Sequence, residues 1–187
     1  MSEPKLLMRS LMTEQEAAAW VTEEELQCAA SFGVEQRRRE FLTWRAMLRQ
    51  ALGRTLKIAY NASGAPVLPD HEAYISVSHA ADRVVVALSS RPTGVDIERM
   101  NRRYDRILHK YLTPAEQRLS TDVRFHAAAW CAKETAYKWA GIRELSFEEV
   151  RLLDYDTERI RLQIRGGEPV TLRVEQLDEE YIMTYMI

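Results

Sequence analysis

Cysteine is scarce in this sequence, and long apolar runs are missing from it. The 187 residues include two cysteines, Cys28 and Cys131, which match neither a disulfide framework nor a metal-binding spacing. No apolar stretch approaches the roughly 20 residues that span a bilayer. The first residues are charged and lack the apolar core of a secretory signal. We therefore expect a cytoplasmic protein with no membrane partner.

The net charge is also close to zero. With 26 Lys and Arg against 28 Asp and Glu, the formal charge is −2, so the chain lacks the strongly basic balance of many nucleic-acid-binding proteins. The local distribution is uneven. Residues 99–110 carry five arginines or lysines against one aspartate, and residues 36–39 form a second basic cluster. Each cluster could face phosphates or an acidic protein, or could be a solvated basic surface.

The apolar content of 46% suits a globular chain of this length, with one large domain or two small packed halves. The first fifty residues are predicted to be helical, with capping boxes at Thr13–Glu16 and Thr22–Glu25. A longer helix is expected over residues 35–52. Gly53 ends it, because glycine tolerates the left-handed conformation of a helix terminus.

Strands and helices alternate in the rest of the chain. Short strands rich in Val and Ile are expected at 74–78, 84–89 and 94–98. Thr113 caps a further helix, another runs over 123–140 to Gly141, and strands follow at 159–165, 169–177 and 181–187. This order predicts an α+β protein of two similarly built halves joined near residues 90–95.

Two carboxylates lie two residues apart on one expected strand. Asp96 and Glu98 therefore point to the same face, where they repel each other unless a cation lies between them. Hard carboxylate oxygens suit magnesium. Taken alone, this pair could equally be a solvated strand face.

Other polar residues fit the same chemistry. Glu134 and Lys138 are one helical turn apart and share a helix face. They could be a metal ligand and a phosphate partner, or an ordinary surface ion pair. His79 ends a strand beside Ser78, where it could donate to an anion or be structural. Arg38 and Arg45, two turns apart, lie near one helix face, and arginine forks suit phosphate. Trp130 and Trp139 are expected to pack in the core.

Four segments, read in order, are similar to the motif series of the 4′-phosphopantetheinyl transferases. They are Gly64-Ala65-Pro66, residues 75–79 (ISVSH), residues 94–98 (GVDIE) and residues 130–138 (WCAKETAYK). The closer resemblance is to the surfactin-synthetase-activating type, a single chain of two pseudo-symmetric halves. It implies that each half packs helices on a small, mainly antiparallel sheet. Residues 1–93 would contact the adenosine and 3′-phosphate of coenzyme A, and residues 94–187 would carry the metal ligands and a pyrophosphate-binding helix.

The resemblance implies a role for each matching residue of the second half. Asp96, Glu98 and Glu134 would hold Mg²⁺ against the pyrophosphate of coenzyme A. Lys138 and Lys133 would contact that pyrophosphate. Glu134 and Lys138 would also be catalytic.

The same comparison assigns residues of the first half and a base. Ser78 and His79 would bind the 3′-phosphate, helped by Arg38 or Arg45. Glu116 matches the family's proposed general base, although its capping-box position alone would explain its presence. A metal-held water is the alternative proton acceptor.

The implied reaction moves phosphopantetheine from coenzyme A to a serine of an apo acyl or peptidyl carrier protein and releases 3′,5′-ADP. We expect a magnesium-dependent monomer. Residues 99–110 would dock the acidic carrier. Ala65 departs from the family, which often has lysine there, so one phosphate contact is missing. The alternatives are a metal-dependent nuclease or phosphodiesterase, and a non-catalytic binder of coenzyme A or carrier proteins.

Overall fold

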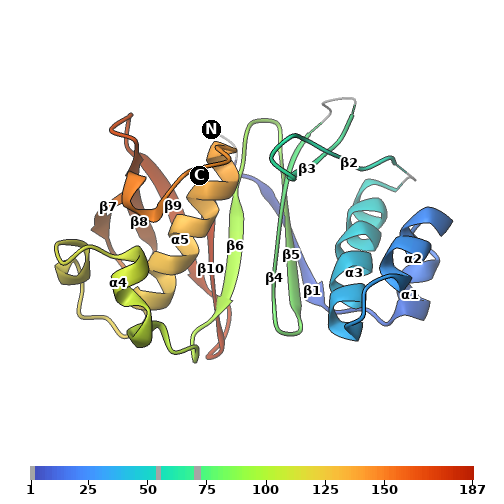
Figure 1. Cartoon of the computed structure of the whole chain (residues 1–187), viewed down its shortest axis with the longest axis horizontal. Coiled ribbons are helices and arrows are strands. Elements are labelled where there is room, and N and C mark those ends of the chain that lie inside the picture. The colour runs from blue at the N-terminus through green and yellow to red at the C-terminus, as the bar shows by residue number, and fades with distance from the viewer. Residues whose placement is uncertain (1–2, 54–55, 70–72) are drawn as a thin grey trace.

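The computed structural model describes residues 3–53, 56–69 and 73–187, and it shows two halves side by side (Figure 1). Each half packs helices on an antiparallel sheet, so the predicted α+β class with two similarly built halves is confirmed. The connection between the two sheets runs from Ser89 to Val95. No helix in the described part of the chain is long and apolar enough to cross a membrane.

The first half is a three-stranded sheet covered by three helices. Strands β1 (Lys5–Ser10), β4 (Tyr74–Ala80) and β5 (Arg83–Ser89) pair in the order β1-β5-β4. Helix α3 (Glu35–Leu52) packs on β5, while α1 (Glu14–Ala18) and α2 (Glu23–Ala30) pack on α3. A two-stranded ribbon, β2 (Ala59–Tyr60) and β3 (Pro66–Val67), completes this half.

The second half is a five-stranded sheet with one long helix on it. Strand β6 (Val95–Arg99) pairs with β10 (Tyr181–Met186), followed by β9 (Val170–Gln176), β8 (Arg159–Ile164) and β7 (Val150–Tyr155). Helix α5 (Phe125–Ala140) packs against β6 and β10. Short pieces connect β6 to α5: a 3-10 turn at Tyr104–Arg106, α4 (Leu108–Tyr111) and a 3-10 turn at Glu116–Arg118. A third 3-10 turn, Phe147–Glu149, precedes β7.

The helix boundaries follow local chemistry, as predicted. Thr13 and Thr22 both cap their helices, and the carboxylate of the glutamate three residues later accepts a hydrogen bond from the backbone amide of each cap. Gly53 and Gly141 end α3 and α5 at φ of 64° and 62°, the left-handed conformation that glycine accepts.

Three local predictions were wrong. Residues 5–10 form strand β1 rather than a helix, because all six pair with β5 in antiparallel register and this tertiary pairing overrides the helix-favouring leucines and methionine. Thr113 does start a capped turn, but only the single 3-10 turn Glu116–Arg118 follows. The third error is that strands β2, β3 and β7 were not predicted at all.

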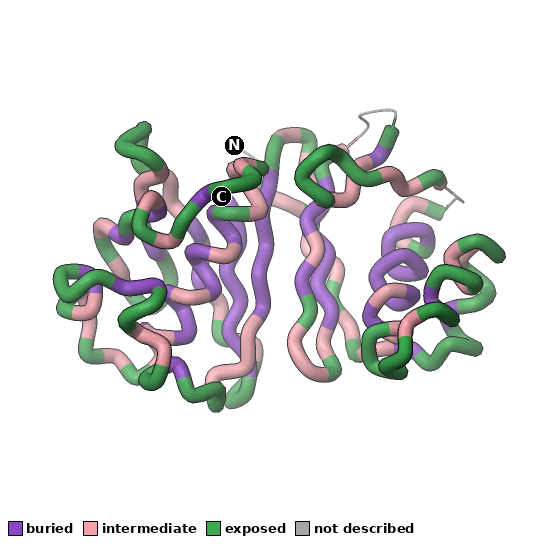
Figure 2. Tube along the Cα trace, viewed as in Figure 1, coloured by how far each residue is buried: buried purple, intermediate pink, exposed green. Residues whose placement is uncertain are grey.

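The two halves meet where β4 and β6 lie side by side, a contact that we call the seam (Figure 1). The two strands belong to different sheets, and side chains rather than a backbone ladder join them. The Ser76 hydroxyl accepts from the Val95 amide at 3.1 Å, and the Ser78 hydroxyl accepts from the Ile97 amide at 3.3 Å. Figure 2 shows buried residues concentrated on these central strands.

Candidate active site

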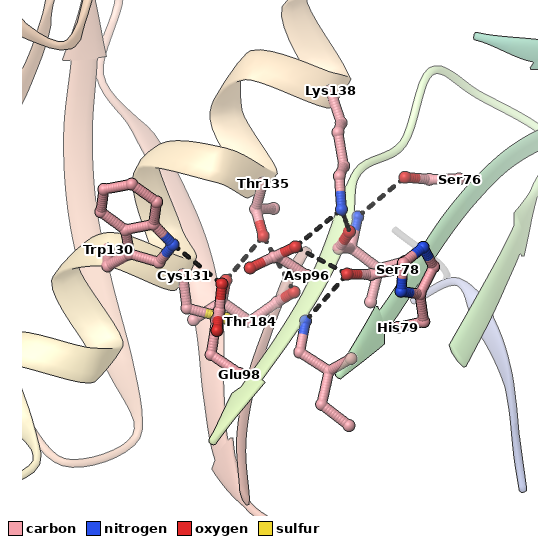
Figure 3. A network of polar contacts seen from close by, with 12 residues as sticks. Ser76, Ser78, His79, Asp96, Glu98, Trp130, Cys131, Thr135, Lys138 and Thr184 are labelled. Atoms are coloured by element: carbon pink, nitrogen blue, oxygen red, sulfur yellow. Dashed lines mark hydrogen bonds and ion pairs between the residues drawn. The ribbon is translucent and has the colours of Figure 1, made fainter. Parts of the chain in front are cut away.

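Asp96 lies at the centre of the seam, with 5% of its surface exposed. Its Oδ1 accepts a hydrogen bond from the Ser78 hydroxyl at 2.7 Å and contacts the Lys138 ammonium at 2.7 Å (Figure 3). Its Oδ2 is buried and has no hydrogen-bond partner among the residues that the structure describes. Because a buried carboxylate oxygen without a partner is costly, this atom has an unused capacity for a cation or a donor.

Glu98 points to the same side of β6 as Asp96, as the strand period predicted. It accepts from the Trp130 indole at 2.8 Å (Figure 3). It also accepts from Arg102 at 3.2 Å and from the Tyr104 hydroxyl at 3.3 Å. Burial raises the pKa of Glu98, and the charge of Asp96 raises it further, against the opposing effect of Arg102 and Trp130. Trp130 was expected only to pack, yet its indole N–H also orients this carboxylate.

Glu134, half-buried on α5, is the third carboxylate of the site. Burial raises its pKa, and the charges of Asp96 and Glu98 add to the rise, while Lys138 and Arg102 lower it. The three carboxylates therefore feel one another's charge. Repulsion of this kind is relieved by a positive ion between them.

Whether these residues fit a magnesium ion depends on the donors they offer. Within residues 3–53, 56–69 and 73–187, no group of three or more His, Cys, Asp or Glu side chains forms a ready-made metal site. The donor chemistry nevertheless fits, because Asp96, Glu98 and Glu134 are hard oxygen ligands with coupled charges and Asp96 Oδ2 is unpaired.

Lys138 reaches across from α5 to the seam. Its ammonium contacts Asp96 and donates to the Val95 carbonyl at 3.1 Å. This reach depends on how closely α5 approaches β6. A Cβ placed on Gly94 would lie 2.4 Å from the Thr135 carbonyl oxygen, so only glycine fits at the start of the GVDIE segment.

Ser78 and His79 are adjacent but face opposite sides of β4. Ser78 is buried, and its hydroxyl is engaged with Asp96 and the Ile97 amide. His79 is exposed, with Nε2 3.2 Å from the Arg37 guanidinium and Nδ1 3.3 Å from Glu40. Burial lowers the pKa of His79, Glu40 opposes this, and Arg37 lowers it further. Arg37 was recognised from the sequence only as part of the 36–39 cluster.

The two arginines predicted to help bind phosphate contact other parts of the first half. Arg38 pairs with Glu14 at 2.7 Å and donates to the Phe32 carbonyl. Arg45 is buried, and its guanidinium lies 3.3 Å from the centre of the Phe41 ring. The same guanidinium donates a hydrogen bond to the Tyr60 hydroxyl. Neither has a contact to Asp96 or His79 among the interactions of the described residues.

Lys133 and Glu116 form a buried ion pair away from the seam. Lys133 Nζ lies 2.9 Å from Glu116 Oε1, and the side chains are 1% and 3% exposed. The same carboxylate accepts from the Leu152 amide at 2.8 Å and from the Thr113 amide at 2.7 Å. Burial alone would raise the pKa of Glu116, but these hydrogen bonds and the Lys133 charge lower it on balance. Lys133 and Glu134, though adjacent, thus serve different environments.

A cavity of about 390 Å³ opens beside Lys138, between the two halves. Its walls come from both halves and include Pro66, Ile75, Thr93 and Trp139. A second cavity of about 250 Å³ shares some of these walls and is also lined by Ser76 and Tyr137. Ala65 lines both cavities. Lys138 lines both cavities and Ser76 lines the second, so these two groups of the seam border a space large enough for part of a nucleotide-sized ligand.

Comparison with known proteins agrees with this arrangement. The family model of the 4′-phosphopantetheinyl transferase superfamily matches residues 92–186, from just before β6 to the end of β10. The chain therefore belongs to this superfamily. The match includes Asp96, Glu98, Glu134 and Lys138.

Two characterised relatives are similar over longer stretches. A 4′-phosphopantetheinyl transferase of Bacillus subtilis is 34% identical over 128 residues, which are 62% of this chain and 54% of that protein. The 4′-phosphopantetheinyl transferase HetI of Nostoc sp. is 27% identical over 169 residues, 80% of this chain and 71% of HetI. The chain thus spans about half the length of the Bacillus relative.

Proposed function

We propose that this protein transfers the 4′-phosphopantetheine group of coenzyme A to a serine of an apo acyl or peptidyl carrier protein, with Mg²⁺, and releases 3′,5′-ADP. Membership of the superfamily and the names of both relatives support the reaction class. The observation that carries the proposal for this chain is the contact of Asp96 with Lys138, which lines a cavity between the halves, with Asp96 Oδ2 unpaired among the described residues.

Asp96, Glu98 and Glu134 are the residues that would hold the magnesium ion. When bound there, the ion would neutralise charge on the pyrophosphate oxygens of coenzyme A, the usual dominant contribution in phosphoryl transfer. Lys138, with 27% of its side chain exposed, would bind a pyrophosphate oxygen. Lys133 is directed to Glu116 and is not assigned to this role.

The carrier's serine supplies the nucleophile. Its oxygen forms a bond to the β-phosphorus, the bond from that phosphorus to the bridging oxygen breaks, and 3′,5′-ADP leaves. We do not assign the serine proton to Glu116, because its buried carboxylate pairs with Lys133 and accepts from the Leu152 and Thr113 amides. A water held beside Asp96, Glu98 and Glu134 would accept this proton instead.

His79 and Arg37 are proposed to receive the 3′-phosphate. The Arg37 guanidinium can only donate, so it donates to His79 Nε2 at 3.2 Å on the exposed side of β4. A phosphate bound beside this pair would accept from Arg37, and from His79 once the Nε2 position carries a proton. The earlier candidates Arg38 and Arg45 have other partners. The Ser78 hydroxyl is likewise committed to Asp96, so we assign that residue a different role below.

The acidic carrier is proposed to dock on the basic stretch of residues 99–110. Within this stretch Arg102 already pairs with Glu98, so the free charge comes from other positions. Reversal of charge at Arg106 and Lys110 should raise the KM for the carrier and leave the KM for coenzyme A unchanged. An unchanged carrier KM would remove this docking surface.

The central test is mass spectrometry of apo carrier proteins incubated with this protein, coenzyme A and Mg²⁺. We expect a mass gain of one phosphopantetheine group, which Asp96→Asn or removal of metal by a chelator should abolish. A carrier whose acceptor serine is replaced by alanine is the control for site. No gain on several diverse carriers, with wild-type protein shown to be folded, would contradict the transferase. Binding of coenzyme A without transfer would indicate a binder, and magnesium-dependent cleavage of DNA a nuclease.

A further inference from the structure

Two serines of β4 make nearly the same contact across the seam. Ser76 and Ser78 are 5% and 6% exposed, and each hydroxyl accepts a hydrogen bond from a backbone amide of β6. They differ in one respect, because only Ser78 also donates, to Asp96 Oδ1 at 2.7 Å (Figure 3). The structure therefore contains its own matched pair of residues, one with and one without the carboxylate contact.

The direction of the hydrogen bonds at Ser78 is fixed. A hydroxyl has one proton to donate, an ionised carboxylate can only accept, and the Ile97 amide can only donate. The Ser78 proton is thus committed to Asp96 while its lone pair receives the amide. This arrangement ties the orientation of the Asp96 carboxylate to the backbone of its own strand.

The second donor to the same oxygen is of a different kind. Lys138 approaches Asp96 Oδ1 at 2.7 Å on a long, partly exposed side chain, which can turn toward a phosphate oxygen. Ser78 is buried and short and cannot leave. When Lys138 moves to a substrate, the Ser78 hydroxyl still holds Oδ1, and the unpaired Oδ2 keeps its direction.

We propose that Ser78 is a positioning residue for the metal site: its hydroxyl fixes the Asp96 carboxylate so that Oδ2 is presented to the divalent cation. This inference rests on the proposed function, since it concerns the same site. The terminal torsion of an aspartate is broad and roughly two-fold, so a carboxylate without this donor samples orientations that do not place an oxygen at the ion. Partners of this kind typically change metal affinity about 10- to 100-fold.

The test measures metal binding rather than turnover. Mn²⁺ is titrated by electron paramagnetic resonance into wild-type protein, Ser78→Ala and Ser76→Ala, each with saturating coenzyme A. We expect the Kd for Mn²⁺ to rise about 10-fold or more in Ser78→Ala and by less than about two-fold in Ser76→Ala. Thermal unfolding in chelator should show that both variants are less stable than wild type, because each leaves one β6 amide without its acceptor. Ser78→Ala should lose more stability, since it also removes the bond to Asp96.

A purely structural role for Ser78 gives a different pattern. Both variants would then lose stability while their Mn²⁺ affinity stays that of wild type, which overturns the inference. If Ser78→Ala does not fold, Ser78→Cys replaces it, since a thiol of similar size is only a weak donor. Equal Mn²⁺ affinity in Ser78→Cys and wild type overturns the inference as well.

Failure of the proposed function looks different again. Wild-type protein that binds no Mn²⁺, with or without coenzyme A, overturns the metal assignment and this inference together. Wild-type binding with an unaffected Ser78→Ala overturns the inference alone. In steady-state assays Ser78→Ala should raise the KM for Mg²⁺ and recover most of kcat at saturating Mg²⁺, while Ser76→Ala keeps the wild-type KM.

Discussion

Replacement of Glu116 by alanine should lower the free energy of unfolding by about 3–5 kcal/mol, because the Lys133 ammonium is then buried without its counter-charge. Lys133 is 1% exposed and keeps only the Phe147 carbonyl, 3.0 Å away, among its contacts in the described residues. The amides of Leu152 and Thr113 also lose the acceptor that they share. An unsatisfied buried amide costs about 1–3 kcal/mol. The loss of stability should therefore lie near the lower end of the range of about 3–5 kcal/mol only if water enters the site and bonds to these amides.

Glu149 is a matched control for this substitution. It too is the glutamate of a capping box, accepting from the Ser146 amide at 2.9 Å, and it too pairs with a cation, Arg165, at 2.7 Å. Its side chain and that of Arg165 are 36% and 47% exposed, however. Because exposed pairs contribute little, Glu149→Ala should cost far less stability than Glu116→Ala.

Urea unfolding followed by circular dichroism measures both changes, and transfer activity well below the melting temperature separates structure from catalysis. Removal of a general base typically lowers the rate about 10²- to 10⁴-fold. The double variant Glu116→Leu with Lys133→Met should regain most of the stability, since an apolar pair of similar volume can replace a buried ion pair, and it should stay active. A stable double variant that has lost activity more than about 100-fold would identify Glu116 as the base and refute this reasoning.

Two further predictions follow from packing and charge. Gly94→Ala should lower the free energy of unfolding in urea by about 1–3 kcal/mol, because the new methyl group meets the Thr135 carbonyl. Gly33→Ala is the control, because the space around Gly33 is open. Equal losses of stability in the two variants would contradict the close approach of α5 to β6. Burial raises the pKa of Glu25, but its bonds to Arg49 and to the Thr22 amide lower it on balance. The folded chain therefore binds fewer protons than the unfolded chain as the pH falls below about 4.5. Between pH 5 and 3, the free energy of unfolding should fall less steeply with pH in Glu25→Gln than in wild type.

Local chemistry accounts for the parts of the fold that the sequence predicted. The capping boxes at Thr13 and Thr22 and the left-handed glycines are set by neighbours within a few residues, and each lies where it was expected. The strand period also placed Asp96 and Glu98 on one face of β6 correctly, because alternation is a property of the strand alone. β1 could not be predicted in this way, since its six residues form a strand through their pairing with β5.

Residue roles at the site were less predictable, because they depend on which element packs opposite. Nothing local distinguishes Arg37 from Arg38, yet one contacts His79 on β4 and the other Glu14 on α1. Lys133 and Glu134 are neighbours on α5, but the turn of the helix directs Lys133 into the core of the second half. The hydrogen-bonding role of Ser78 likewise requires knowing that β6 lies beside β4.

In the seam, side chains that join the two halves lie beside the Asp96 carboxylate of the candidate site. Had β4 and β6 paired as a regular ladder, backbone carbonyls would have accepted the Val95 and Ile97 amides. Serine hydroxyls accept them instead, and the strands belong to separate sheets. A hydroxyl, unlike a carbonyl, has a proton left to donate, and at Ser78 that proton reaches Asp96. At Ser78 one hydroxyl thus both joins the halves and contacts the Asp96 carboxylate, so its substitution should lower stability and metal affinity together. Substitution of Ser76, which lacks the second contact, should lower stability alone.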